Sequence, residues 1–146
     1  SATADATGVA IGYNATTGAY TVTAAIGAGA SGTNSAATVV GRSATAALGS
    51  VAFGTAAEAG AVAVAIGYLA KATNGYSVAI GYAQETTADY QVRFGPKHVE
   101  LTEVASEPAA GAADSGRLYL RDNGAGKTQL CARFASGAVQ VIATEP

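Results

Sequence analysis

The stretch Val78-Ala79-Ile80-Gly81 decides the fold, because related segments recur through the first two thirds of the chain. Each copy ends in a glycine that follows an apolar residue. The copies occupy residues 9–12, 24–27, 38–41, 51–54, 64–67 and 78–81, and a divergent one ends at Gly95. Their glycines are separated by 15, 14, 13, 13, 14 and 14 residues. Periodicity of this kind is typical of a repeat architecture.

The length of the repeat indicates the kind of architecture. A unit of about 14 residues that contains two glycines is too short and too broken for a helical hairpin, given rises of about 1.5 Å per helical residue and 3.3 Å per strand residue. It fits two strands of roughly 4 to 5 residues and two tight turns. The sequence therefore predicts an all-β, parallel β-solenoid, with one unit for each coil.

Alternation within the unit predicts which side chains face inward, because residues two apart in a strand point to the same face. We expect the apolar residue before each glycine to form an internal ladder. The ladder would consist of Ile11, Ile26, Val40, Phe53, Ile66 and Ile80. The alanine that precedes it would face outward. Because one chain of small side chains buries little surface, this alanine face is expected to pack against copies of the same chain.

The repeat glycines are expected to supply the turns, in a conformation that other residues disfavour. They are Gly12, Gly27, Gly41, Gly54, Gly67 and Gly81. An alanine lies three residues after most of them, which suits a second sheet packed unusually close to the first.

The unit resembles the head repeat of trimeric autotransporter adhesins, in which Ser-Val-Ala-Ile-Gly is followed by two residues and an alanine. The segment Tyr76-Ser77-Val78-Ala79-Ile80-Gly81 matches best, and the resemblance covers roughly residues 8–95. It implies a left-handed parallel β-roll and a homotrimer. The same repeat is known in bacteriophage fibre proteins.

Charge density divides the chain. Residues 1–90 carry six charged side chains, and residues 91–146 carry twelve. We predict a repeat array over 1–95, a linker or neck over 96–116, and an antiparallel β meander over 117–146. The alternation over residues 95–104 also predicts a strand between the array and the rest of the linker. The meander is expected to turn at Asp122-Asn123-Gly124. It resembles the C-terminal module of tailed-phage fibre and minor tail proteins.

Composition excludes several classes of function. The net charge of −2 argues against a nucleic-acid partner. No stretch approaches the roughly 18 apolar residues of a membrane-spanning helix, so no membrane insertion is expected. A single cysteine, Cys131, gives neither an intrachain disulfide nor a metal cluster, and we expect it to be structural. His98 is the only histidine and reads as a solvated linker residue. No cofactor is expected.

One motif imitates a nucleotide site. Gly124-Ala125-Gly126-Lys127-Thr128 resembles a phosphate-binding loop, but the first glycine of that motif is replaced by Arg121. A hairpin turn is the better interpretation. The scattered carboxylates, such as Glu100 with Glu103, lack a catalytic companion. We predict that the protein is not an enzyme.

The post-glycine column, defined as the residues that directly follow the repeat glycines, is a candidate recognition surface. It consists of Tyr13, Ala28, Arg42, Thr55, Tyr68 and Tyr82. If the coils stack in register, the tyrosines lie on one external line. Two interpretations stay open: the rings contact a host glycan or protein, or they shield a turn or a seam between subunits. We favour the second interpretation. Tyr20 and Tyr76 are expected at the opposite turn, where the same two interpretations apply.

These observations favour a homotrimeric fibre segment of a bacteriophage virion, most simply a tail fibre, that attaches to the host surface without catalysis. Its expected location is the virion surface, with other tail or capsid proteins as partners. A capsid-mounted fibre and a head fragment of a bacterial trimeric adhesin are the alternatives. The adhesin family ends in a coiled-coil stalk and a membrane anchor, for which the chain carries no signal. An ice-binding solenoid is disfavoured because the threonines do not recur in register.

Overall fold

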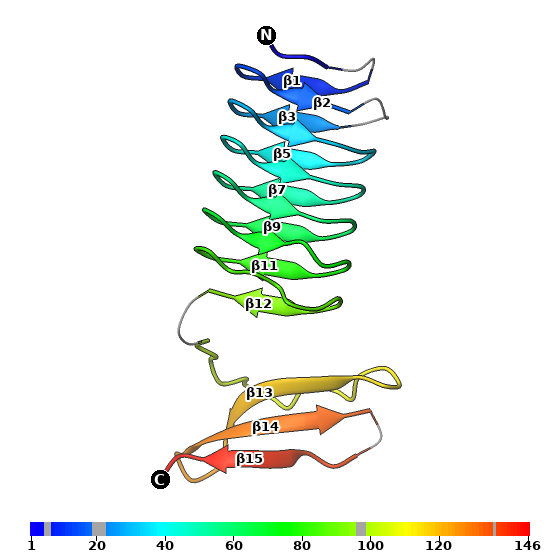
Figure 1. Ribbon diagram of the computed structural model, residues 1–146. Coiled ribbons are helices and arrows are strands. Elements are labelled where there is room, and N and C mark those ends of the chain that lie inside the picture. The colour runs from blue at the N-terminus through cyan, green and yellow to red at the C-terminus, as the bar shows by residue number, and fades with distance from the viewer. Residues whose placement is uncertain (5–6, 19–22, 96–98, 136) are drawn as a thin grey trace. The chain divides into compact units, whose positions relative to one another are not determined.

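The structure is a computed structural model that describes residues 1–4, 7–18, 23–95, 99–135 and 137–146 (Figure 1). The chain forms two compact units, Ser1–Lys97 and His98–Pro146. Every regular element among the described residues is a β-strand, so the predicted all-β class is confirmed. Within these residues no helix is long and apolar enough to cross a membrane.

The first unit is a stack of coils, and most coils contribute one strand to each of two parallel sheets (Figure 1). The first sheet contains β1 (Val9–Ile11), β3 (Ala24–Ile26), β5 (Thr38–Val40), β7 (Val51–Phe53), β9 (Val64–Ile66), β11 (Val78–Ile80) and β12 (Val92–Phe94), in that order. The second sheet contains β2 (Thr16–Thr17), β4 (Ser31–Gly32), β6 (Thr45–Ala46), β8 (Glu58–Ala59) and β10 (Lys71–Ala72). The predicted parallel β-solenoid is confirmed, although its strands are shorter than expected because the turns take up more of each unit.

The two turns of a coil differ in length. The first turn, which leads from the first sheet to the second, has a constant length, and the return turn, which leads back, has a variable one. Wherever a first-sheet strand is followed by a second-sheet strand, the chain advances five positions from the end of the first to the start of the second, as from Ile11 to Thr16. The return turn varies, advancing five positions from Ala46 to Val51 and six from Ala72 to Val78. The insertions therefore fall in the return turn, and the strands keep their register, with Ile66 opposite Ile80.

The predicted internal ladder is wrong, because the large apolar side chains point outward. Ile11 is 56% exposed and Phe53 is 54% exposed. Ile26 and Ile66 are also exposed, while Val40 and Ile80 are half-buried. The predicted outer alanine face is therefore wrong as well.

The interior is instead built from the small residues between them. Those of the first sheet are fully buried: Ala25, Val39, Ala52, Ala65 and Ala79. They face buried alanines of the turn and the second sheet, including Ala30, Ala44, Ala57 and Ala70, which confirms the closely packed second sheet. The five-position turn brings the two sheets so close that mostly methyl-sized side chains fit between them. A core of close-packed small groups has little room for an isoleucine.

The repeat glycines hold the turn conformation predicted for them. Their φ angles lie between 122° at Gly81 and 142° at Gly41 and Gly54, a region that side-chain-bearing residues rarely adopt. Space is also restricted. A Cβ atom added to Gly54 would collide with the carbonyl group of Gly67 in the next coil.

The second unit is built on the predicted meander. Its strands β13 (Gly116–Asp122), β14 (Thr128–Phe134) and β15 (Gln140–Thr144) form one antiparallel sheet. Tyr119 and Cys131 are paired across β13 and β14 and are buried on one face. On the other face, Leu118, Leu120 and Leu130 line an open apolar hollow of about 500 Å³ together with Val99 and Leu101.

The segment predicted as a linker contacts this sheet. Glu107 forms ion pairs with Arg121 and with Arg133, at 3.6 Å in the second case. Arg133 also donates to the carbonyl of Pro108 at 3.0 Å, and Arg117 to that of Ala109 at 2.7 Å. The strand expected over residues 95–104 is not formed among residues 99–104. These residues make one isolated β-bridge, between Glu103 and Leu120. The arginines of the meander thus hold residues 107–109 against it.

We predict that Gly54→Ala destabilises the solenoid strongly. Placing a side-chain residue in this φ region costs about 1–3 kcal/mol, and the contact with the Gly67 carbonyl adds to that cost. Gly75→Ala is the matched control, since its added Cβ would make only ordinary contacts, 3.7 Å from the carboxylate of Asp89 and 4.0 Å from the carbonyl oxygen of Ala61. Chemical denaturation should give a lower midpoint for Gly54→Ala alone. Equal midpoints for the two variants would contradict this account of the turn.

Candidate recognition surfaces

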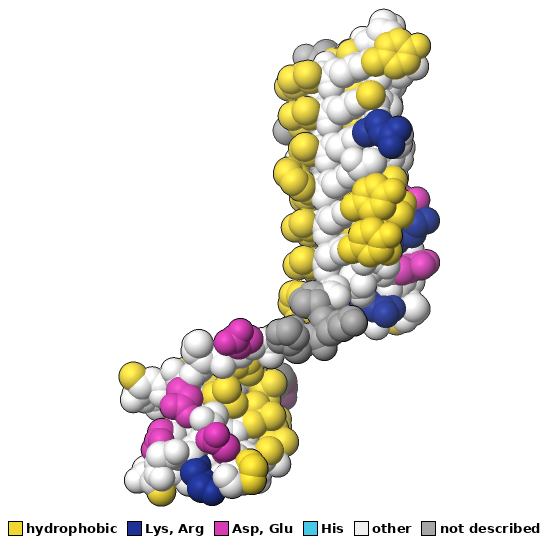
Figure 2. Space-filling view, turned by 90° about the vertical axis from the view of Figure 1, so that its left-hand side faces the viewer, with side chains coloured by type: hydrophobic (Ala, Val, Ile, Leu, Met, Phe, Trp, Pro, Cys, Tyr) yellow, Lys and Arg dark blue, Asp and Glu magenta, His cyan; other side chains and the backbone are white. Residues whose placement is uncertain are grey.

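The outward faces of the two sheets differ in chemistry. The apolar stripe, defined as the outward side chains of the first sheet, runs along one side of the coils (Figure 2). Its most exposed members are Val9, Ile11, Ile26, Phe53, Ile66, Val92 and Phe94. Each strand contributes to it. In β3, β7, β9 and β11 an apolar residue lies on both sides of a buried alanine, β5 contributes Val40 beside Thr38, and β12 contributes Val92 and Phe94 on either side of an exposed Arg93. The stripe is therefore continuous from coil to coil.

The outward face of the second sheet is polar. Thr16 donates a hydrogen bond to Ser31 across neighbouring coils at 3.2 Å. Further along, Lys71 and Glu58 form an ion pair at 3.1 Å. Both side chains are more than a third exposed, so the pair contributes little to stability. A polar face of this kind suits contact with water.

The post-glycine column lies on the turn of constant length, at the edge between these faces. Backbone hydrogen bonds fix its register: the amide of Leu69 donates to Thr55 at 3.0 Å, and that of Ala83 donates to Tyr68 at 2.9 Å. The rings of Tyr68 and Tyr82 stack with centroids 5.6 Å apart. Tyr13 is 74% exposed, and three coils without a ring separate it from Tyr68. The structure thus brings together two of the three predicted tyrosines.

The return turn carries a second aromatic pair. Tyr76 and Tyr90 stack with centroids 4.9 Å apart and ring planes 2° apart. Tyr76 is at the turn expected for it. Tyr90 was not among the predicted residues, although its spacing of 14 residues from Tyr76 is that of the repeat and could have indicated the pair. Tyr20, also expected there, lies outside the described residues. Both tyrosines of the pair have positive φ, 54° and 58°.

A buried polar network supports the coil that carries the stacked pairs. The hydroxyl of Ser77 donates to the Asn74 carbonyl at 2.6 Å and lies 3.1 Å from the hydroxyl of Thr86. Thr86 in turn donates to the side chain of Asn74 at 3.2 Å. Because these hydroxyls are paired, the site of an interior alanine can hold a threonine here without a desolvation penalty.

The segment that resembles a phosphate-binding loop, residues 124–128, includes the hairpin turn between β13 and β14. The side chain of Asp122 accepts the amide of Gly124, and that of Asn123 accepts the amide of Ala125 at 2.7 Å. A phosphate would need such amides free. Lys127 is exposed at the end of this turn.

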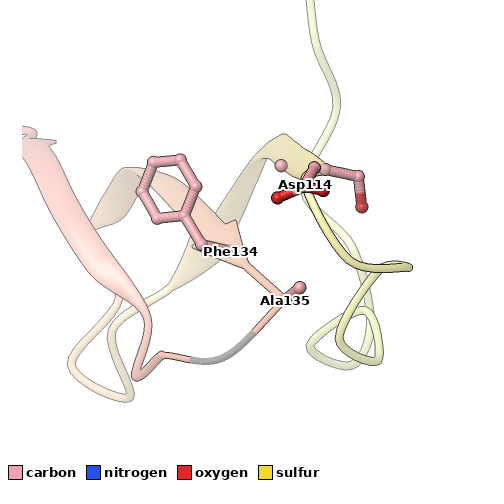
Figure 3. Close-up of a pocket in the computed structure, with 5 residues that line it drawn as sticks. Asp114, Phe134 and Ala135 are labelled. Carbon is pink, nitrogen blue, oxygen red and sulfur yellow. The ribbon is translucent and has the colours of Figure 1, made fainter.

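Other residues singled out in the sequence also occupy structural positions. Cys131 is fully buried, and Glu103 accepts a hydrogen bond from Thr128. His98 lies outside the described residues. A hollow of about 280 Å³ beside the end of β14 is lined by Asp114, Ser115, Gly116, Phe134 and Ala135 (Figure 3). It combines one carboxylate with one aromatic ring, which is too little to define a chemistry.

The fold and its surfaces define a repeat protein: a parallel β-solenoid with one apolar and one polar face, followed by a small antiparallel sheet. No protein-family model and no curated protein matches the chain. Among solved structures, it is similar to the collagen-binding domain of the Yersinia adhesin YadA, with 27% sequence identity and a TM-score of 0.49. The match covers 74% of this chain and 68% of that one. Because the TM-score of this match is only 0.49, the comparison does not assign a function, and the function is argued from the residues of this chain.

We predict that the Tyr68–Tyr82 stack is energetically coupled. Stacked aromatic pairs contribute about 0.5–1.5 kcal/mol beyond the area they bury. A double-mutant cycle with Tyr68→Ala and Tyr82→Ala, measured by chemical denaturation, should give a coupling in that range. The same cycle with Tyr13→Ala and Tyr82→Ala should give none, because those rings are far apart in the array. Equal coupling in the two cycles would show that the stack contributes nothing of its own.

Proposed function

We propose that the protein is a segment of a homotrimeric, extracellular adhesive fibre, in which the solenoids associate through the apolar stripe. The observation that carries this proposal is the stripe itself. Soluble monomers rarely expose a contiguous apolar patch of more than a few hundred Å². Seven stacked strands at about 4.8 Å extend the stripe for roughly 30 Å. A surface of this kind is stabilised by a partner.

The periodicity of the stripe favours further copies of the same chain as that partner. Apolar side chains recur at every coil, as the opposed pairs Ile11 with Ile26 and Phe53 with Ile66 illustrate. Only a partner with the same spacing can interdigitate along the whole length. A second solenoid of identical sequence meets that requirement. The trimeric state is inferred from the resemblance of Tyr76–Gly81, and of the other copies of the repeat, to the head repeats of trimeric adhesins.

The second unit carries an apolar surface of its own. Leu118, Leu120 and Leu130 line its hollow and are supplemented by Val99 and Leu101. A sheet of three strands is near the lower limit of independent stability. Association of the second units through this surface would support the same assembly as the stripe, and it would place the oligomer contacts along both parts of the chain.

Adhesion without catalysis is the activity we propose. Its support is that the described candidate groups have structural partners: Glu103 with Thr128, Glu107 with two arginines, and Glu58 with Lys71. A fibre acts through repeated weak contacts, which multivalency makes effective. Host-surface glycans or proteins are the partners we propose, with the exposed tyrosines as contact groups.

We propose the surface of a bacteriophage virion as the location, as a tail fibre or a capsid-mounted fibre. The support is the resemblance of Arg117–Pro146 to the C-terminal module of phage fibre proteins. The head of a bacterial trimeric adhesin is the second candidate, and the repeats over residues 8–95 favour it equally.

We predict a native molar mass of about 43 kDa, which is three chains of 14.2 kDa. Phe53→Lys with Ile66→Lys should give folded monomers, because two charges in the stripe cannot be desolvated in an interface. Thr45→Lys, on the polar face, is the matched control and should remain a trimer. Sedimentation equilibrium measures all three. A wild-type monomer, or trimers of the double variant, would contradict the proposed interface.

We predict that antibodies against the purified chain label fibres on phage particles released from the source culture. Immunoelectron microscopy distinguishes the two locations. Labelling of the bacterial envelope in the absence of particles would support the adhesin instead. Labelling of neither, in a culture that expresses the chain, would contradict an extracellular fibre.

A further inference from the structure

One face of the Tyr68 ring is left uncovered in the post-glycine column. The gap beside it, at the position of Thr55 and between Tyr68 and Arg42, is called the step. The ring of Tyr82 stacks on the side of Tyr68 that faces the later coil. In the preceding coil the column position is Thr55, whose small side chain cannot cover the other face. The register is fixed by the hydrogen bond from the Leu69 amide to the Thr55 carbonyl at 3.0 Å. Tyr68 accordingly remains 50% exposed although it is stacked.

Arg42 closes this step on its far side. It occupies the column one coil before Thr55, since the amide of Ala56 donates to the Arg42 carbonyl at 2.8 Å. Two coil spacings, roughly 10 Å, thus separate the backbone positions of Arg42 and Tyr68. Arg42 is exposed, and its guanidinium forms no ion pair or hydrogen bond with the described residues. Figure 2 shows a basic side chain and aromatic side chains in succession along this edge of the solenoid.

The other charges near the step are largely compensated. Glu58 and Lys71 lie on the polar face, in the coils of Thr55 and Tyr68, and neutralise each other at 3.1 Å. The carboxylate of Glu85 belongs to the coil of Tyr82, one coil further away. Arg42 therefore leaves a net positive charge on the side of the step that Tyr68 does not occupy.

We propose that this step binds one ring of an acidic polysaccharide, a hexuronate, between Tyr68 and Arg42. The C–H groups of a pyranose face carry partial positive charge and pack on the negative face of a tyrosine ring. The hydroxyl of Thr55 can donate to or accept from a sugar hydroxyl. The planar guanidinium of Arg42 binds the carboxylate with two parallel hydrogen bonds. One coil spacing beyond Tyr68 provides the thickness that a stacked ring needs.

This site deepens the proposed function, on which its biological use rests, because it names the surface chemistry that the fibre would recognise. Each chain contributes one such step, so a fibre of three chains carries three. Sites of this openness bind single rings weakly. A polymer that engages several sites at once is retained far longer.

The probe is a hexamer of galacturonic acid, and its fully methyl-esterified form is the matched ligand control. Titration calorimetry with the wild-type protein should detect the acid and give at least tenfold weaker binding of the ester, which keeps the ring but lacks the charge. Tyr68→Ala and Arg42→Gln should each reduce affinity for the acid at least tenfold. Tyr76→Ala, at the other turn, and Lys127→Gln, in the second unit, should leave it unchanged.

A filling variant keeps the test independent of folding defects. Thr55→Tyr extends the stack into the step and should abolish binding while raising the midpoint of thermal unfolding. Undetectable binding of the acid by the wild type, equal affinities for acid and ester, or binding that survives Thr55→Tyr would overturn the site.

Molar mass and attachment to cells, measured on the same preparations, separate this outcome from the proposed function. A trimer that attaches to cells and ignores the acidic probe keeps the fibre and removes the site. A monomer that binds the probe in the predicted manner keeps the site and removes the fibre.

Discussion

The close approach of successive coils is the constraint on which the first unit depends. Each coil hydrogen-bonds to the next through its backbone, as the amide of Gly67 does to the carbonyl of Phe53 at 2.8 Å. At the first turn this spacing leaves no room for a Cβ atom between the carbonyl of one glycine and the next. Within a coil, the same short turn holds the two sheets so close together that mostly methyl-sized side chains fit between them. Alanine and glycine are abundant because these two distances are short.

The thin interior limits the stability of a single solenoid and leaves the large apolar side chains on its surface. Alanines such as Ala52 and Ala65 are fully buried, yet each buries little area, so a single solenoid gains little from its own core. The large apolar side chains, which could contribute more, project from the first sheet. Under the proposed function they are buried only on association. The stability of such a protein depends on its concentration and its oligomeric state.

The asymmetry between the turns explains where a recognition surface can form. The first turn has constant length, so the residues after the glycines form a column with fixed spacing. The return turn absorbs the insertions, yet it still stacks Tyr76 on Tyr90 in the coils where the repeat is regular. A line of side chains at constant spacing can be varied residue by residue without disturbing the fold. Arg42, Thr55 and Tyr68 are such variations.

The repeat determined the coil, the parallel sheets, the turn glycines and the alignment of Tyr68 with Tyr82, because spacing along the chain becomes spacing in space once coils stack. The meander followed from its alternation and its Asp122-Asn123-Gly124 turn. Alternation could not decide which of two faces is the interior: it separates Ala65 from Ile66 but assigns neither to the inside. The tertiary structure decided that, because the width of the coil is set by the five-position turn and only the smaller set fits. Likewise, only the folded chain placed Pro108 and Ala109 against the arginines of the meander, since such contacts depend on distance in space and leave no periodic trace in the sequence.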